Sequence, residues 1–178
     1  SPAQQAFARE RAERGGYADR IDLELCDYRD VRGSYDHIVS IEMIEAVGER
    51  FWPTYFGQLS ARLKPGGRCV VLAITIDDAL FARYRRGTDF IQRYIFPGGM
   101  LPCPKSVRQQ AGNVGLAIVD DFAFGPDYAR SLAHWHRNFE AQLGAVRAQG
   151  FDERFIRMWR FYLAYCEAGF NSGDVDVH

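Results

Sequence analysis

The stretch YDHIVSIEMIEAVGERFWPTYFGQLSARLKPGGRCVVLAI, residues 35–74, decides the fold class. Its short apolar run Ile38–Ile41 is typical of a buried parallel strand. Residues 49–63 then place apolar side chains at helical spacing, and the breaker Lys64–Gly67 ends that predicted helix. A second buried strand is predicted over Cys69–Ile74. The order strand, helix, strand indicates an α/β fold with a parallel sheet.

The remaining chain continues with helices and strands. Three glycine pairs, at residues 15–16, 66–67 and 98–99, follow predicted helices or loops, and none follows a first strand. The glycine-rich turn that opens a nucleotide-binding α/β domain is therefore missing, and we expect residues 1–178 to be part of one domain, cut at both ends. Helices are expected over residues 1–15, 106–111, 128–149 and 152–170, and strands over residues 21–26, 116–124 and 175–177.

Composition excludes several classes of protein. Of 178 residues, 47% are hydrophobic and 14% aromatic, which is enough for a core and argues against disorder. Lys and Arg total 22 against 23 Asp and Glu, so no surplus positive charge favours nucleic acid. No apolar run is long enough to span a bilayer, and the four cysteines have no C-x-x-C spacing. We expect a soluble, cytoplasmic protein without a metal site.

Four blocks of the sequence resemble one enzyme family. They are residues 36–48, 63–67, 94–102 and 127–135, with the YIFPGG-LP and DYA-x-SL-x-x-W patterns the most specific of them. Together they resemble the cyclopropane-fatty-acyl-phospholipid synthases and mycolic acid cyclopropane synthases, which are S-adenosylmethionine-dependent class I methyltransferases. The resemblance covers essentially the whole chain. It implies the distal half of a Rossmann-like methyltransferase domain, with an incomplete sheet and a helical insertion over the active site.

The resemblance also implies an activity. The family transfers a methyl group from S-adenosylmethionine to a cis double bond in the acyl chain of an unsaturated phospholipid. The resulting carbocation loses a proton, for which bound bicarbonate is the acceptor, and the ring closes. The expected partners are therefore unsaturated acyl chains at the membrane surface, reached by a cytoplasmic protein that binds the membrane peripherally. Self-association into a homo-oligomer is a further expectation, because an incomplete parallel sheet exposes apolar faces.

Family roles carry over to three residues. The carboxylate that orients bicarbonate falls on Glu45, the tyrosine of the same site on Tyr128, and a backbone contact on Ile74. The family histidine falls on Leu72, which cannot hydrogen-bond an anion. Glu42 has no matching role and is interpreted as an acid at the edge of the site, just past the predicted strand.

Asp27 and Tyr28 are predicted to bind the cofactor. They follow the predicted strand 21–26, where the carboxylate can accept from the adenine amino group and the ring can stack on the base. An ordinary loop with an Asx turn explains the same residues. The aromatic and arginine-rich stretch 81–100 is similarly either an acyl-channel wall with a basic rim or a core stripe with a solvated face.

Two alternatives to a ring-forming enzyme remain open. One is a non-catalytic remnant that keeps the shape and binds lipid or a partner. The other is an acyl-chain methyltransferase that leaves a methyl branch without closing a ring. Leu72 favours both, since a ring-closing enzyme needs an anion site at which the proton is removed.

Overall fold

A computed structural model describes all 178 residues, which form two compact units, residues 1–33 and 34–178. The smaller unit contains helix α1 (Pro2–Arg14) and the 3-10 turn η1 (Ala18–Arg20). The helix expected over residues 1–15 is confirmed. The strand expected over residues 21–26 is wrong, because this segment pairs with no other strand. Its alternating pattern needs a neighbouring strand to become a sheet. The prediction of one domain over the whole chain stays a prediction.

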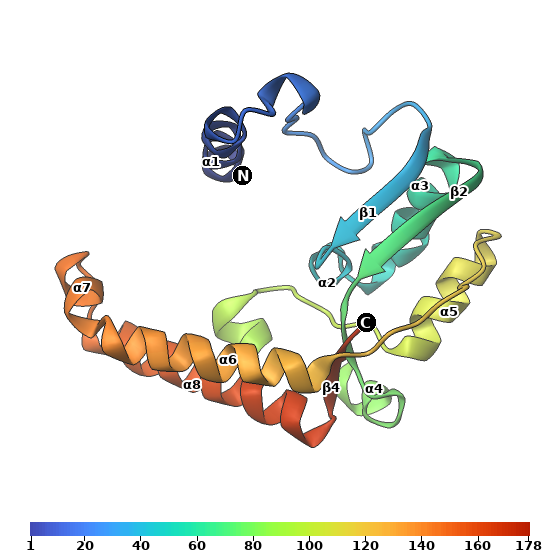
Figure 1. Cartoon of the computed structure of the whole chain (residues 1–178). Coiled ribbons are helices and arrows are strands. Elements are labelled where there is room, and N and C mark those ends of the chain that lie inside the picture. The colour runs from blue at the N-terminus through green and yellow to red at the C-terminus, as the bar shows by residue number, and fades with distance from the viewer. The chain divides into compact units, whose positions relative to one another are not determined.

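The larger unit begins with two parallel strands, β1 (Tyr35–Ile41) and β2 (Leu63–Leu72). Ile38 pairs with Cys69 and Ile41 with Leu72, so the two strands finish level with each other. Figure 1 shows both arrows pointing the same way. Because the two strands are parallel and finish level, their carboxyl ends lie at one edge of the sheet. A crossover connection is needed to join them.

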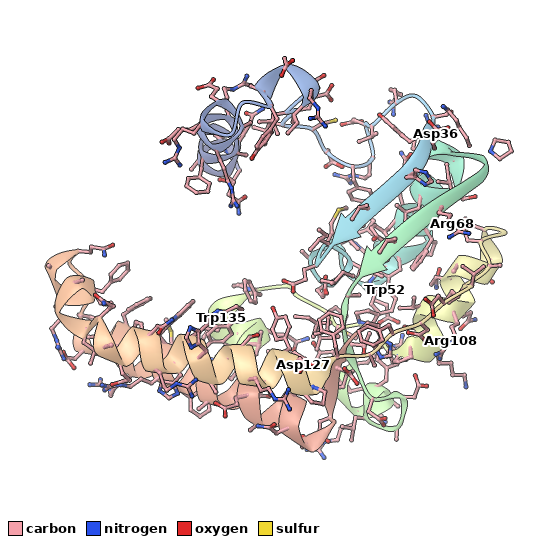
Figure 2. All side chains as sticks on the ribbon, viewed as in Figure 1. Asp36, Trp52, Arg68, Arg108, Asp127 and Trp135 are labelled. Carbon is pink, nitrogen blue, oxygen red and sulfur yellow. The ribbon has the colours of Figure 1, made fainter.

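The crossover confirms the predicted helix and supplies part of the core. It runs through α2 (Ile44–Val47), η2 (Glu49–Phe51) and α3 (Trp52–Arg62). Trp52 and Tyr55 of α3 are 2% and 1% exposed, and Tyr55 Oη donates to Ser40 Oγ of β1 at 2.7 Å (Figure 2 labels Trp52). The helix therefore covers one face of the two strands.

The turn predicted at residues 64–67 lies within the first part of β2, where the pairing with β1 shifts register between Tyr35 and His37. Gly66 has a φ of 77°, a region that favours glycine. A Cβ on Gly67 would lie 2.6 Å from the carbonyl oxygen of Asp36, so the close approach of the two strands requires glycine there.

The face of the strands opposite α3 is apolar and open to solvent. Val39 and Ile41 of β1 are 65% and 67% exposed, and Val70 of β2 is 59% exposed. Val39 and Val70 are direct partners in the parallel register. Buried parallel strands usually have apolar side chains on both faces, so this exposure agrees with the prediction of an incomplete sheet.

A second small sheet pairs β3 (Ile74–Ile76) antiparallel with β4 (Val175–Val177), which confirms the predicted final strand. Between them lie α4 (Asp78–Tyr84), the π-helical turn η3 (Ile91–Ile95) and α5 (Pro104–Asn113), the last covering the predicted helix over residues 106–111. The strand expected over residues 116–124 is wrong. There, Phe124 N donates to the Val177 carbonyl at 3.0 Å, but the segment is not paired along its length.

Two long helices, α6 (Gly125–Ala141) and α8 (Glu153–Ser172), lie side by side in Figure 1, joined through α7 (Leu143–Ala148). Their buried contact includes Leu132, Leu163 and Phe170, with Val177 of β4. The helix predicted over residues 128–149 is divided at Gln142, whose φ of −111° interrupts the helical backbone. The helix predicted over residues 152–170 is confirmed. Every helix is too short or too polar to pass through a lipid bilayer.

Candidate active site

The carboxyl ends of β1 and β2 gather four of the residues singled out in the sequence. Glu42 N donates to the Leu72 carbonyl at 2.8 Å, so the chain leaving β1 stays hydrogen-bonded to the end of β2. Ile74 N donates to Glu45 Oε1 at 2.6 Å, which joins the predicted pair of Glu45 and Ile74. Open α/β sheets bind ligands at this edge, so the geometry defines a candidate active site.

Glu45 is held in a setting that disfavours its charge. Its second carboxylate oxygen, Oε2, is buried without a hydrogen-bond partner. Burial raises the pKa of Glu45 above its ordinary value, the backbone N–H bonds oppose that rise, and the neighbouring Glu42 carboxylate adds to it. The Glu45 carbonyl accepts from Met100 N at 2.8 Å, which ties the segment after η3 to the same place. Glu45 is thus positioned from both its backbone and its side chain.

Glu42 contacts the third predicted residue, Tyr128. Tyr128 Oη donates to Glu42 Oε1 at 3.0 Å, across 86 residues of sequence. Burial, followed by the charge of Glu42, raises the pKa of Tyr128 well above its usual range, so the hydroxyl stays protonated and remains a donor. The ring lies 4.9 Å from that of Phe170 and 5.9 Å from that of Trp135, measured between centroids.

Glu42 also has an unusual backbone. Its φ of 45° makes it the one non-glycine residue with a positive φ in the chain. L residues other than Asn and Asp rarely adopt this conformation, which costs about 1–3 kcal/mol. The family resemblance gives Glu42 no role, and its sequence position predicted only an acid at the edge of the site. The signal in the sequence is a second carboxylate at the end of a predicted strand, three residues before Glu45.

Leu72 adds no hydrogen-bonding side chain to this edge. It is partly buried and packs against the core formed by α6, α8 and β4. The position to which the resemblance assigns an anion-binding histidine therefore serves packing in this chain.

A cavity of about 1160 Å³ opens beside these carboxylates. Glu42, Glu45 and Ile74 line its sheet end. Gln92 Nε2 fixes part of the wall by donating to Tyr84 Oη at 3.2 Å and to the Gly99 carbonyl at 3.0 Å. The rest of the lining is largely apolar and comes from β3, α4, η3 and α8, including Ile76, Leu80, Ile91, Phe96, Tyr162 and Phe170.

The stretch 81–100 contributes directly to this cavity. Several of its aromatic and apolar side chains line the wall, and Arg83 is the arginine of the stretch that does so. Arg85 instead forms an ion pair with Glu49 at 2.8 Å, and Arg86 Nε donates to the Ala82 carbonyl at 3.0 Å. The stretch is thus a cavity wall, while Arg85 and Arg86 make contacts within the protein.

Asp27 and Tyr28 belong to the smaller unit, and their surroundings are those of an exposed loop. Asp27 Oδ1 accepts from Arg29 N and Nε, each at 2.9 Å, and Oδ2 accepts from Arg29 Nη2 at 2.7 Å. These bonds lower the pKa of Asp27 to about 2. The Arg29 guanidinium carbon lies 5.9 Å from the centroid of the Tyr28 ring. The backbone bond from Arg29 to Asp27 is the Asx-type contact of the loop interpretation.

Comparison with solved structures identifies the class of protein. The chain is similar to the mycolic acid cyclopropane synthase CmaA1 complexed with SAH and CTAB, with 26% identity and a TM-score of 0.77, over 86% of this chain and 57% of that chain. It is also similar to the cyclopropane synthase MmaA2 from Mycobacterium tuberculosis, with a TM-score of 0.78 at 23% identity, over 91% and 63% of the two chains. The fold is therefore that of the class I S-adenosylmethionine-dependent methyltransferases, as predicted.

The family follows from the sequence match. The model of the family described as mycolic acid cyclopropane synthetase matches residues 1–178, and the chain belongs to that family. Over the whole chain it is 46% identical to the tuberculostearic acid methyltransferase UfaA1 of Mycobacterium tuberculosis, covering 42% of that protein. Over 99% of the chain it is 35% identical to the cyclopropane-fatty-acyl-phospholipid synthase of Escherichia coli K12, covering 44% of it. The chain thus spans less than half the length of these relatives.

Proposed function

We propose that the complete protein carrying this chain transfers a methyl group from S-adenosylmethionine to the double bond of an unsaturated fatty acyl chain in a phospholipid. The observation that carries the proposal is the carboxylate edge of the sheet, with its Glu45–Ile74 hydrogen bond, opening into a largely apolar cavity of about 1160 Å³. An apolar wall suits an acyl chain, and a polar end suits the reacting double bond. Family membership and the relatives' names support the same chemistry.

The residues present fit S-adenosylmethionine at its adenine end. A carboxylate offers about four lone-pair sites, and three on Asp27 accept from Arg29, so one remains for the adenine amino group. Tyr28 offers a ring on which the base can stack. When bound, the cofactor supplies an electrophilic methyl group on a positively charged sulfur.

Glu45, Ile74 and Tyr128 are proposed to organise the removal of the proton that follows methyl transfer. Ile74 N orients the Glu45 carboxyl through Oε1, and Tyr128 Oη directs a donor to the same sheet edge. Burial keeps water from the Oε2 atom of Glu45. The bicarbonate that the resemblance implies does not fit this arrangement, because Ile74 N and Tyr128 Oη already donate to Glu45 and Glu42, and Leu72 offers no donor.

Methyl transfer without ring closure is the second candidate. Leu72 in place of the family histidine favours it, as does the 46% identical relative whose name is tuberculostearic acid methyltransferase. A third reading, a lipid- or partner-binding remnant, predicts no transfer at all. We propose that the acyl chain is reached at the membrane surface by a cytoplasmic protein.

The test is an assay of the complete protein with methyl-labelled S-adenosylmethionine and vesicles of an unsaturated phospholipid. Fatty acids released from the vesicles are identified by mass. We expect label in the acyl chains, with matched vesicles of saturated phospholipid remaining unlabelled. A cyclopropane, a methylene branch and a methyl branch are distinguished by mass and by hydrogenation. Absence of label from the unsaturated vesicles would contradict the proposal and favour the remnant.

A further inference from the structure

We infer that the side chain of Glu42 is the base that removes the proton after methyl transfer, in place of a bound anion. The inference rests on the proposed function. It assigns a catalytic role to a residue for which the family resemblance provides none. Three features of the sheet edge carry it: the partners of the two donors, the backbone of Glu42, and the neighbouring Glu45.

The first feature is that two carboxylates of the protein accept hydrogen bonds from donors of the expected anion site. The resemblance assigns Ile74 N, Tyr128 Oη and a histidine at position 72 to bicarbonate. Here Ile74 N donates to Glu45 Oε1 at 2.6 Å and Tyr128 Oη donates to Glu42 Oε1 at 3.0 Å. Position 72 is a leucine that packs against the core. Glu42 Oε1 therefore accepts the hydrogen bond that the tyrosine would otherwise donate to a free anion.

The second feature is the conformation of Glu42. A φ of 45° is far easier for glycine, yet a glutamate is present, held there by the bond from its N to the Leu72 carbonyl at 2.8 Å. Backbone strain of this kind persists where the surrounding structure enforces it, and it concentrates at functional sites. The strained backbone places the Glu42 side chain on the lining of the cavity.

The third feature is the difference in environment between the two acids. Two acids at one site take different roles when their environments differ. Glu45 is half-buried, with Oε1 held by Ile74 N and Oε2 without a partner. Glu42 is exposed, lines the cavity and accepts a hydrogen bond from Tyr128 Oη, so it is the carboxylate that can reach both a substrate and solvent.

The proposed step balances in atoms and electrons. The π pair of the double bond forms the new carbon–carbon bond to the methyl group, while the electrons of the broken sulfur–methyl bond remain on sulfur. The other alkene carbon becomes a cation. Glu42 then accepts a proton from the new methyl group, and the electrons of that C–H bond close the ring onto the cation. If a hydride first moves from the methyl-bearing carbon to the cationic carbon, the cation lies beside the methyl group and the same deprotonation forms a methylene double bond. Protonated Glu42 returns its proton to solvent.

The experiment compares four forms of the complete protein in buffer freed of carbon dioxide and in buffer with added bicarbonate. They are the wild type, Glu42→Gln, Glu42→Gly and Glu42→Asp. Glycine adopts the observed φ without strain, so Glu42→Gly removes the carboxylate while the backbone is retained. Glu10→Gln, on the exposed face of α1, is the control for removing one carboxylate. The readouts are acyl products on unsaturated phospholipid vesicles and the line width of ¹³C-bicarbonate in NMR.

We expect wild-type turnover to be the same with and without bicarbonate, and Glu42→Gln to lose about 10²–10⁴-fold, as is typical when a positioned base is lost. Glu42→Asp should retain more activity than Glu42→Gln. Bicarbonate should restore part of the turnover of Glu42→Gly and broaden its ¹³C signal saturably, but leave the wild-type signal sharp.

Two results would overturn the assignment: a wild type that needs bicarbonate, or a Glu42→Gln protein with wild-type turnover in its absence. Either would leave the proposed methyl transfer standing. A wild type that labels no acyl chain under any condition would instead reject the proposed function, and the role of Glu42 with it.

Discussion

Asp27 and Glu45 are two acids predicted from the sequence to contact ligands, and the structure gives them opposite surroundings. Asp27 lies in an exposed loop and makes three contacts to Arg29, two residues away. Glu45 is half-buried at the edge of a parallel sheet and accepts from Ile74, 29 residues away. The pKa of Asp27 falls to about 2, whereas that of Glu45 rises.

The difference shows how distance along the chain relates to chemistry. Asp27 is paired with a residue two positions away, so its ion pair depends only on the local conformation of its own loop. Glu45 depends on β1 and β2 finishing at the same level, because only then does Ile74 N meet its carboxyl group. A carboxylate whose pKa is raised in a cavity is a candidate for proton transfer, and an exposed ion pair is not.

Among the substitutions that test this comparison, Glu45→Gln should have the largest effect. The change keeps the size of the side chain and an acceptor for Ile74 N, but removes the acid from the cavity. We expect a loss of about 10²–10⁴-fold in turnover on unsaturated phospholipid vesicles. Glu10→Gln removes an exposed carboxylate of α1, far from Glu45 in the sequence, and should leave turnover near that of the wild type. Wild-type turnover in Glu45→Gln would remove the contrast with Asp27 and the assignment of the site.

Tyr128→Phe should cost less. The ring keeps its contacts with Phe170 and Trp135, and the bond from the hydroxyl to Glu42 Oε1 is lost. A hydrogen bond to a charged group contributes about 1.5–3 kcal/mol, so turnover should fall about 10- to 150-fold. Steady-state rates should show the loss in kcat, and far-UV circular dichroism should match the wild type. A loss as large as that of Glu45→Gln would mean that the tyrosine does more than donate to Glu42.

Asp27→Ala should have a smaller effect, confined to cofactor binding. Loss of one hydrogen bond of about 1 kcal/mol corresponds to roughly a fivefold rise in the Kd for S-adenosylmethionine, measured by calorimetry on the complete protein. Arg29→Gln keeps the Asp27 carboxylate and removes its ion pair. If Asp27 only shapes the loop, the two variants weaken binding equally. If it contacts adenine, Asp27→Ala weakens binding more.

The smallest effects are on the free energy of unfolding. The contributions of Glu45 and Asp27 change in opposite directions with pH. The raised pKa of Glu45 means that its contribution to the free energy of unfolding is fully present below 4.5 and is lost as pH rises. The lowered pKa of Asp27 means that its contribution is present above 3.8 and is lost as pH falls toward about 2. Urea unfolding of the wild type, Glu45→Gln and Asp27→Asn across this range measures both. If the free energy of unfolding changed with pH in the same way for all three proteins, the opposite pKa shifts of Glu45 and Asp27 would be contradicted.

Local sequence patterns were sufficient to predict the helices, whose backbone hydrogen bonds lie within the element. The helices α1, α3 and α8 follow from apolar spacing, caps and breakers, because each of these signals acts over a few residues. The apolar run of β1 was also predicted correctly, and that strand has its partner in β2. The family resemblance also pointed correctly to the class I methyltransferase fold. Residues 21–26 and 116–124 failed as strands because a strand needs a partner, which alternation alone does not supply.

Only the tertiary structure decided how the carboxylates are paired. Glu45 was identified from a family motif, but its bond to Ile74 requires two strands to finish level with each other. The bond between Glu42 and Tyr128 joins residues 86 positions apart, through a glutamate whose φ of 45° no local pattern predicts. The sequence by itself determined the residue types at the sheet edge. Their roles depended on burial and distance, which set pKa values and exist only once the chain is folded.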